Sequence, residues 1–196
     1  MFKRLFGGQK RKPKVAIIFD IGSDSVAGSV VHFSENPEEF PRIIYTKRTH
    51  WQSDNQSSYE DILRSMRYTL GNVARAIQEK DFPISGGGDI YVTFSAPWFA
   101  HEMRRAEISR KTVFTVNQSI LNKIKDKEIK SFYKESENIY GDDFEVIEKT
   151  IVDISVNGYP TDKPVGKKAK NINLSIYLSI APKDILDTTR DVLGRV

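Results

Sequence analysis

The clearest pattern along the chain is a strict alternation of apolar and polar residues over 171–181. Isoleucine or leucine occupies every second position from Ile172 to Ile180, and Asn, Ser or Tyr occupies the positions between them. Successive side chains of a β-strand point to opposite faces of its sheet, so this alternation predicts a strand with one buried face and one wetter face. Further strands are expected at 15–19, 26–33, 42–49, 89–95, 98–109, 112–116 and 144–156.

Apolar residues with helical spacing occur in three other segments. From Tyr59 to Ile77 an apolar residue recurs every third or fourth position, which predicts a helix over 59–79 with one continuous apolar stripe. Further helices are expected at 119–134 and directly after Pro182, because proline suits the first turn of a helix. The predicted order is therefore β-β-β-α in the first part of the chain, followed by an α+β unit with one sheet and two helices on its apolar face.

The run from Ser85 to Gly88, which reads Ser-Gly-Gly-Gly, is the clearest break in the sequence. Glycine-rich segments are typical of linkers, so we place a domain boundary here. Three parts are expected: a basic flexible tail at 1–13, a first domain at 14–84 and an α+β domain at 85–196.

Charge changes this picture only at the N-terminus. The 196 residues carry a net charge of +4, but the first 14 hold six basic residues and no acidic one. A basic excess confined to a short tail argues against a nucleic-acid-binding surface. Residues 1–12 also contain Phe and Leu among their cations, which predicts weak contact with an anionic membrane surface, with a solvated tail as the alternative. The chain has no cysteine and no apolar run near the ~20 residues of a membrane span, so we expect a cytoplasmic protein.

The turn after the first strand is the segment with candidate chemistry. The Asp20 carboxylate at the strand end could hold a divalent metal ion through water. Gly22 has no Cβ, so an anion could approach the backbone, and the hydroxyls of Ser23 and Ser25 could donate to phosphate oxygens together with the neighbouring N–H groups. We interpret this turn, Asp24 included, as a candidate nucleotide-phosphate site, with a purely structural turn as the alternative.

Other candidate sites are weaker. The three histidines, His32, His50 and His101, lie in different elements without the spacing of metal ligands and are read as surface or core residues. Asp142 and Asp143 are read as a solvated turn. No nucleophile with a plausible base is found, so no catalytic residue is predicted.

Two segments resemble a known family. Residues 17–23 resemble the first phosphate motif of the actin-like ATPase superfamily, and most specifically that of the bacterial cell-division protein FtsA, which reads Asp-Ile-Gly-Thr-Ser. From Phe144 to Val196, including the turn at 162–166, the sequence is similar to the subdomain inserted in FtsA. The resemblance covers roughly 14–196. It implies an α/β (α+β) fold, namely a partial actin-like (ribonuclease H-like) lobe followed by a small α+β inserted subdomain.

The resemblance also implies a function in assembly. Family members tether the division ring to the membrane, so we expect residues 85–196 to contact division-ring proteins and to self-associate, at the inner face of the cell membrane. Family members bind ATP with magnesium. Here the family's second phosphate motif, Asp-Ile-Gly-Gly-Gly, does not occur, and Asp24-Ser25 stands where the family commonly has Ser-Lys. Half an ATP site with an added carboxylate gives no expectation of enzyme activity. The alternatives are a nucleotide-binding actin-like ATPase of which this chain is a piece, and the related pilus-assembly actin-like protein, which shares the Asp-Ile-Gly-Ser opening.

Overall fold

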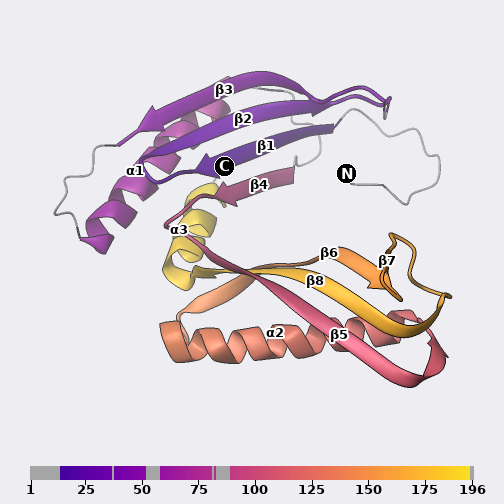
Figure 1. The fold of residues 1–196 in the computed structure, drawn as a ribbon. Helices are drawn as coiled ribbons and strands as arrows, with labels where there is room; N and C mark the ends of the chain where they lie inside the picture. Colours follow the sequence, from indigo (N-terminus) through magenta and orange to yellow (C-terminus); the bar gives the residue numbers. More distant parts are fainter. Residues whose placement is uncertain (1–13, 37, 52–57, 81, 83–88, 195–196) are drawn as a thin grey trace. The chain divides into compact units, whose positions relative to one another are not determined.

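The computed structural model describes residues 14–36, 38–51, 58–80, 82 and 89–194. Within this part the fold is mixed α+β, with two four-stranded sheets and three helices (Figure 1). The chain divides into two compact units, Met1–Ala96 with Asp187–Val196, and Pro97–Leu186. The predicted tail at 1–13 and the glycine run lie outside the described residues. None of the described helices is long and apolar enough to cross a membrane.

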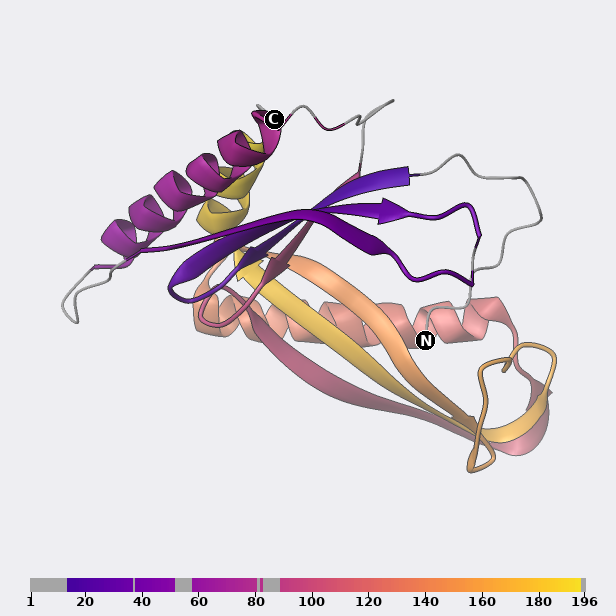
Figure 2. The same ribbon diagram turned by 90° about the horizontal axis from the view of Figure 1, so that it is seen from above.

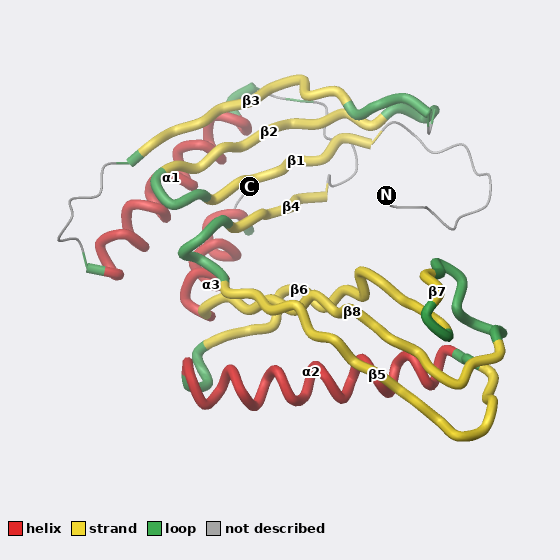
Figure 3. The backbone as a smooth tube through the Cα atoms, viewed as in Figure 1, coloured by secondary structure: helices red, strands yellow, loops and turns green. Residues whose placement is uncertain are grey.

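The sheet of the first unit has the strand order β3-β2-β1-β4 (Figure 3). The strands β1 (Lys14–Ile21), β2 (Ser25–Phe33) and β3 (Arg42–His50) are antiparallel neighbours, while β4 (Asp89–Phe94) runs parallel to β1. The helix α1 (Tyr59–Gln78) lies along one face of this sheet (Figures 1 and 2). This is the predicted β-β-β-α order, completed by a fourth strand.

Local sequence explains where α1 begins and which side it buries. Ser58 and Asp61 form a capping box: the Asp61 N–H donates to Ser58 Oγ at 3.2 Å and the Ser58 N–H donates to the Asp61 carboxylate at 3.3 Å. The Ser58 hydroxyl also donates to the Asp61 carboxylate at 2.9 Å, and this bond, followed by the one from the Ser58 N–H, lowers the pKa of Asp61. The predicted apolar stripe is the buried side of the helix, with Met66, Leu70, Val73, Ala74 and Ile77 at its centre.

The strand at 89–94 corrects the expected domain boundary. It was expected to open the second domain, yet it pairs with β1 from Ala16–Asp89 to Ile21–Phe94. The boundary therefore lies between Ala96 and Pro97 instead of at 85, and the chain returns to the first unit at Asp187. A run of glycines indicates that the backbone there can adopt many conformations. It does not indicate which sheet the next strand joins.

The second unit contains the other sheet, with strand order β5-β8-β6-β7. Its long strands are β5 (Ala100–Thr115), β8 (Lys168–Pro182) and β6 (Phe144–Val156), and β7 (Tyr159–Pro160) is a short edge. The helix α2 (Gln118–Tyr140) runs along one face. All neighbouring strands are antiparallel.

The alternation predicted for 171–181 is confirmed on β8, whose apolar set is at most 4% exposed: Ile172, Leu174, Ile176, Leu178 and Ile180. Two expectations nearby are wrong in detail. The strands expected at 98–109 and 112–116 are one strand, because pairing with β8 resumes at Phe114–Ala169 after a register shift. The helix α3 (Lys183–Leu193) starts after Pro182 as predicted, but it continues into the first unit from Asp187.

Arg104 of β5 ties α2 to this sheet. Its side chain is 10% exposed, and its guanidinium donates to both carboxylate oxygens of Glu135 on α2, at 2.5 and 3.2 Å, and to Glu102 at 3.1 Å. The guanidinium also lies 5.3 Å from the centre of the Phe132 ring. A buried charge is costly unless it is paired, so the ion pair between Arg104 and Glu135 favours the observed position of α2 on the sheet.

The ion pair predicts how stability depends on pH. Hydrogen bonds from Arg104 and then Ser131 lower the pKa of Glu135 below its usual value of 4.5. A lowered pKa in the folded state gives stability that is present above the unfolded pKa and is lost as the pH falls through the folded pKa. We therefore expect Glu135→Gln to lower the melting temperature at neutral pH, and the two melting curves to converge as the pH falls below about 4.5. Circular dichroism melts across pH test this, with Glu137→Gln, an exposed glutamate of the same helix, as control. Parallel curves for wild type and Glu135→Gln would contradict it.

Candidate functional site

One row of residues crosses all four strands of the first sheet at the predicted turn. Arg48 on β3 lies opposite Ala27 on β2, Ala27 lies opposite Asp20 on β1, and Asp20 lies opposite Thr93 on β4. Residues opposite one another in a sheet project from the same face, so these four side chains share one face. In the next row Gly28 faces Val73 and Ile77 of α1, so the polar row lies on the face opposite the helix.

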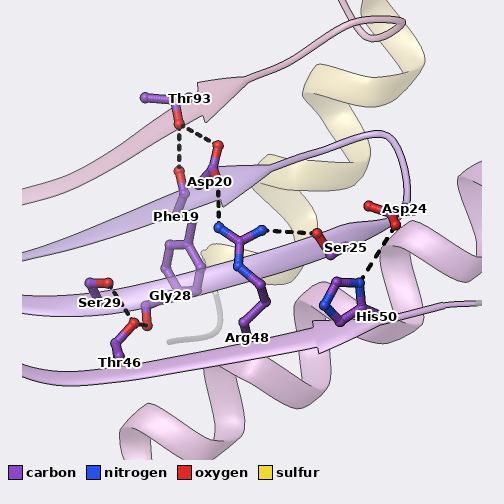
Figure 4. A network of polar contacts seen from close by, with 10 residues as sticks. All are labelled: Phe19, Asp20, Asp24, Ser25, Gly28, Ser29, Thr46, Arg48, His50 and Thr93. Atoms are coloured by element: carbon purple, nitrogen blue, oxygen red, sulfur yellow. Dashed lines mark hydrogen bonds and ion pairs between the residues drawn. The ribbon is translucent and has the colours of Figure 1, made fainter.

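The polar members of this row bond one another (Figure 4). The Asp20 carboxylate accepts from the Arg48 guanidinium at 3.1 Å through one oxygen and from the Thr93 hydroxyl at 3.2 Å through the other. The second terminal nitrogen of Arg48 donates to the Ser25 hydroxyl at 2.9 Å. Ala27 lies between Arg48 and Asp20, and its small side chain leaves room for the guanidinium to reach across β2.

A second acid–base pair lies at the tip of the turn. The His50 imidazole is 3.6 Å from the Asp24 carboxylate, and both side chains are about two-thirds exposed. The backbone N–H of Trp51 donates to the Asp24 carbonyl at 2.9 Å and holds the end of β3 against the turn. Each carboxylate of the turn thus has a basic partner from β3 (Figure 4).

The backbone of the turn is closed on itself. The Gly22 N–H donates to the Ser25 carbonyl at 2.8 Å, and the Ser95 N–H donates to the Ile21 carbonyl at 2.9 Å. A Cβ on Gly22 would lie 3.2 Å from that Ser25 carbonyl oxygen, which is a backbone atom. Glycine at this position therefore makes a tight turn, and its N–H is already used. Ser23 and Asp24 are the exposed residues of the turn.

The predicted residues are therefore brought together, but with partners that sequence reasoning missed. Arg48, Thr93 and His50 were not predicted as site residues, and His50 was read as an ordinary surface or core residue. Arg48 and His50 are two positions apart on one strand, so a register for β3 against β2 would have placed both beside the turn.

In this arrangement groups that a magnesium nucleotide would meet already have partners. Arg48 already neutralises Asp20, so a divalent cation at Asp20 would have to displace the guanidinium. An incoming phosphate would meet the Asp24 carboxylate, and the Arg48 donors it would use are engaged by Asp20 and Ser25. Within the described ranges no group of three or more His, Cys, Asp or Glu could hold a metal ion by itself, but a magnesium nucleotide needs only one or two protein carboxylates. What the arrangement does is fasten the turn, β3 and β4 to one another.

The chain matches no protein-family model and no curated protein. Solved structures with partial similarity include the PPX-GPPA enzyme of Aquifex aeolicus, at 13% identity and a TM-score of 0.30, over 42% of this chain and 36% of that one. A chain of the PilM-PilN type IV pilus biogenesis complex is similar at 11% identity and a TM-score of 0.44, over 91% of this chain and 44% of that one. A further Ppx/GppA family structure from Aquifex aeolicus gives 12% identity and a TM-score of 0.29, over 65% and 62%. The match covers less than two thirds of each of these proteins.

Proposed function

We propose that this chain is part of an actin-like assembly protein of the FtsA type, which acts through protein–protein contacts and does not hydrolyse nucleotide. The observation that carries the proposal is the path of the chain. It builds a β-β-β-α-β unit, leaves it after Ala96, forms a separate sheet and helix over 97–186, and returns at Asp187. Such a path is what an inserted subdomain of the kind implied by the sequence resemblance would give, and it supports the proposal.

The hydrogen bonds within the turn and between Asp20 and Arg48 support an assembly role over the ATPase alternative. With Asp20 bound to Arg48 and the Gly22 N–H bound within the turn, two of the groups expected to hold a magnesium phosphate already have partners. We expect no heat when ATP and magnesium are titrated into the protein in a calorimeter. The Arg48→Ala variant is titrated in parallel, because this substitution removes the partner of Asp20 and leaves the hydrophobic core unchanged. Saturable heat with the wild type would favour the nucleotide-binding alternative.

The second unit carries the edge best suited to docking. Edge strands expose N–H and C=O groups that can pair with another chain, and proteins protect such edges with bulges. On β6 the pairing with β8 shifts twice, whereas β5 pairs with β8 without a shift from Ala100 to Ser109. Among the described strands none pairs with the outer side of β5. We propose that β5 is the edge through which copies of the protein associate; a membrane contact by residues 1–12 stays a prediction.

Cross-linking tests this association, because the natural chain has no cysteine. Single cysteines are placed in turn at His101, Met103, Arg105 and Glu107, all exposed and on one face of β5. If two β5 strands pair, oxidation is expected to give dimer strongly at the one or two positions nearest the two-fold axis, since a disulfide needs Cα atoms about 5.5 Å apart. Lys130→Cys on α2 is the control and should stay monomeric. A monomer in sedimentation velocity, with no dependence of cross-linking on position, would contradict the proposal.

A further inference from the structure

A groove of about 420 Å³ lies along the side of α1 that faces away from the sheet core, with the end of α3 as its other wall. It is unconnected with the turn at Asp20. The side chains that matter are basic and aromatic on α1, with one acid on α3: Arg64, Arg67, Tyr68, Arg75 and Asp191. Gly71 lies in the same lining, in the middle of α1.

Three features of this groove have no explanation within the chain. The Arg67 side chain is exposed and forms no ion pair with any described residue, and Tyr68 is 72% exposed. Gly71 sits in a helix interior, where glycine costs about 1 kcal/mol relative to alanine. Apart from the neighbouring backbone of α1 itself, no described atom lies within 4 Å of the place where a Cβ on Gly71 would stand, so packing inside the protein does not require glycine there. The exposed Arg67 and the glycine at position 71 are both explained if a ligand from outside the chain occupies the groove.

The spacing of the arginines indicates the shape of the ligand. Arg64 and Arg75 are about 16 Å apart along the helix axis at the usual rise of about 1.5 Å per residue. One phosphate group cannot span that distance, whereas an extended peptide of about five residues can, at about 3.3 Å per residue. Arg64 is already paired with Asp61 at 3.2 Å, but both side chains are more than half exposed, so that pair is weak and Arg64 can turn to a ligand.

We propose that this groove binds an acidic, extended peptide segment of a partner protein. Its carboxylates would pair with Arg64, Arg67 and Arg75, and one apolar side chain would sit over Gly71 beside the Tyr68 ring. Asp191 on the opposite wall repels carboxylates and so turns the acidic side of the peptide toward α1. The proposal goes beyond the assembly role of residues 97–186 and does not depend on it.

Fluorescence anisotropy with a labelled heptapeptide of glutamates around a central leucine tests this on the full chain. We expect saturable binding that weakens with salt, because the contacts are charge pairs at the surface. Arg67→Ala is expected to weaken binding about tenfold, as for the loss of one well-placed charged contact. Gly71→Leu is expected to abolish binding, because the leucine side chain would occupy the part of the groove where the apolar side chain of the peptide is expected to sit. Leucine is a better helix former than glycine, so this variant should melt no lower than the wild type, and lost binding there cannot come from unfolding.

The matched control is Arg42→Ala, which removes an exposed arginine of β3 that does not line the groove. It should bind the peptide as the wild type does. No saturable binding by the wild type overturns the proposal, as does an equal loss in Arg42→Ala or full binding in Gly71→Leu. Competition by inorganic phosphate as effective as that by the unlabelled peptide would also overturn it, because an isolated anion would then be sufficient.

Discussion

Leu174→Asp is expected to unfold the second unit. Leu174 is 1% exposed on β8, the strand between β5 and β6, where it lies opposite Ala106 and Ile154. Replacing it removes about 1.5–3 kcal/mol of burial and places a charge in an apolar core without a partner. A buried unpaired charge costs several kcal/mol more, so the sum approaches the whole stability of a unit this size.

Trp98 provides the measurement. It belongs to the second unit and is 1% exposed, while the other tryptophan, Trp51, belongs to the first. In a Trp51→Phe background the emission of Trp98 should shift to the red in Leu174→Asp and show no cooperative transition in urea. Asn173→Asp is the matched control, since it adds the same charge one position away on the exposed face of β8. A wild-type transition in Leu174→Asp would show that this strand does not face the core.

Gly28→Ala is expected to destabilise the first unit by about 1–3 kcal/mol, the range for overpacking a filled core. A Cβ on Gly28 would lie 2.7 Å from a methyl carbon of Val73 and 2.7 Å from one of Ile77, and 3.1 Å from the Phe19 ring. Contacts this short are not tolerated, so the Val73 and Ile77 side chains, or α1 itself, would have to shift. Glycine at this point is what lets the helix approach the sheet.

The same substitution elsewhere in the unit should have the opposite sign. At Gly71 a Cβ meets open space, so Gly71→Ala is expected to stabilise the helix by about 0.5–1 kcal/mol. Thermal melts of both variants by circular dichroism make the comparison. A loss of stability in Gly71→Ala, or none in Gly28→Ala, would contradict the packing of α1 described above.

Much of the local structure could be predicted from the sequence. The strand at β8 and the helix α1 were identified because their patterns repeat with the periods of two and 3.6 residues that these structures impose. The turn at 20–25 was identified because strand, glycine and small polar residues follow one another directly along the chain. In each of these cases the signal lies within a few neighbouring residues.

The partners of the candidate site could not be predicted in this way. Asp20 meets Arg48 and Thr93 only because β2 lies between β1 and β3 and β4 joins the other side of β1, all in one register. A shift of one residue in any of these pairings would turn the side chains to opposite faces. The sequence carries no local mark of that register.

The amino-acid sequence by itself therefore determined the elements, the facing of β8 and the chemistry available at the turn, because these depend on periodicity and on neighbours along the chain. The tertiary structure alone decided that β4 belongs to the first sheet, that Arg48 closes on Asp20, and that Arg67 and Gly71 face a groove. Those facts arise from residues distant in sequence that pack together, and pairing across a sheet or between helices is selected by the free energy of the whole unit.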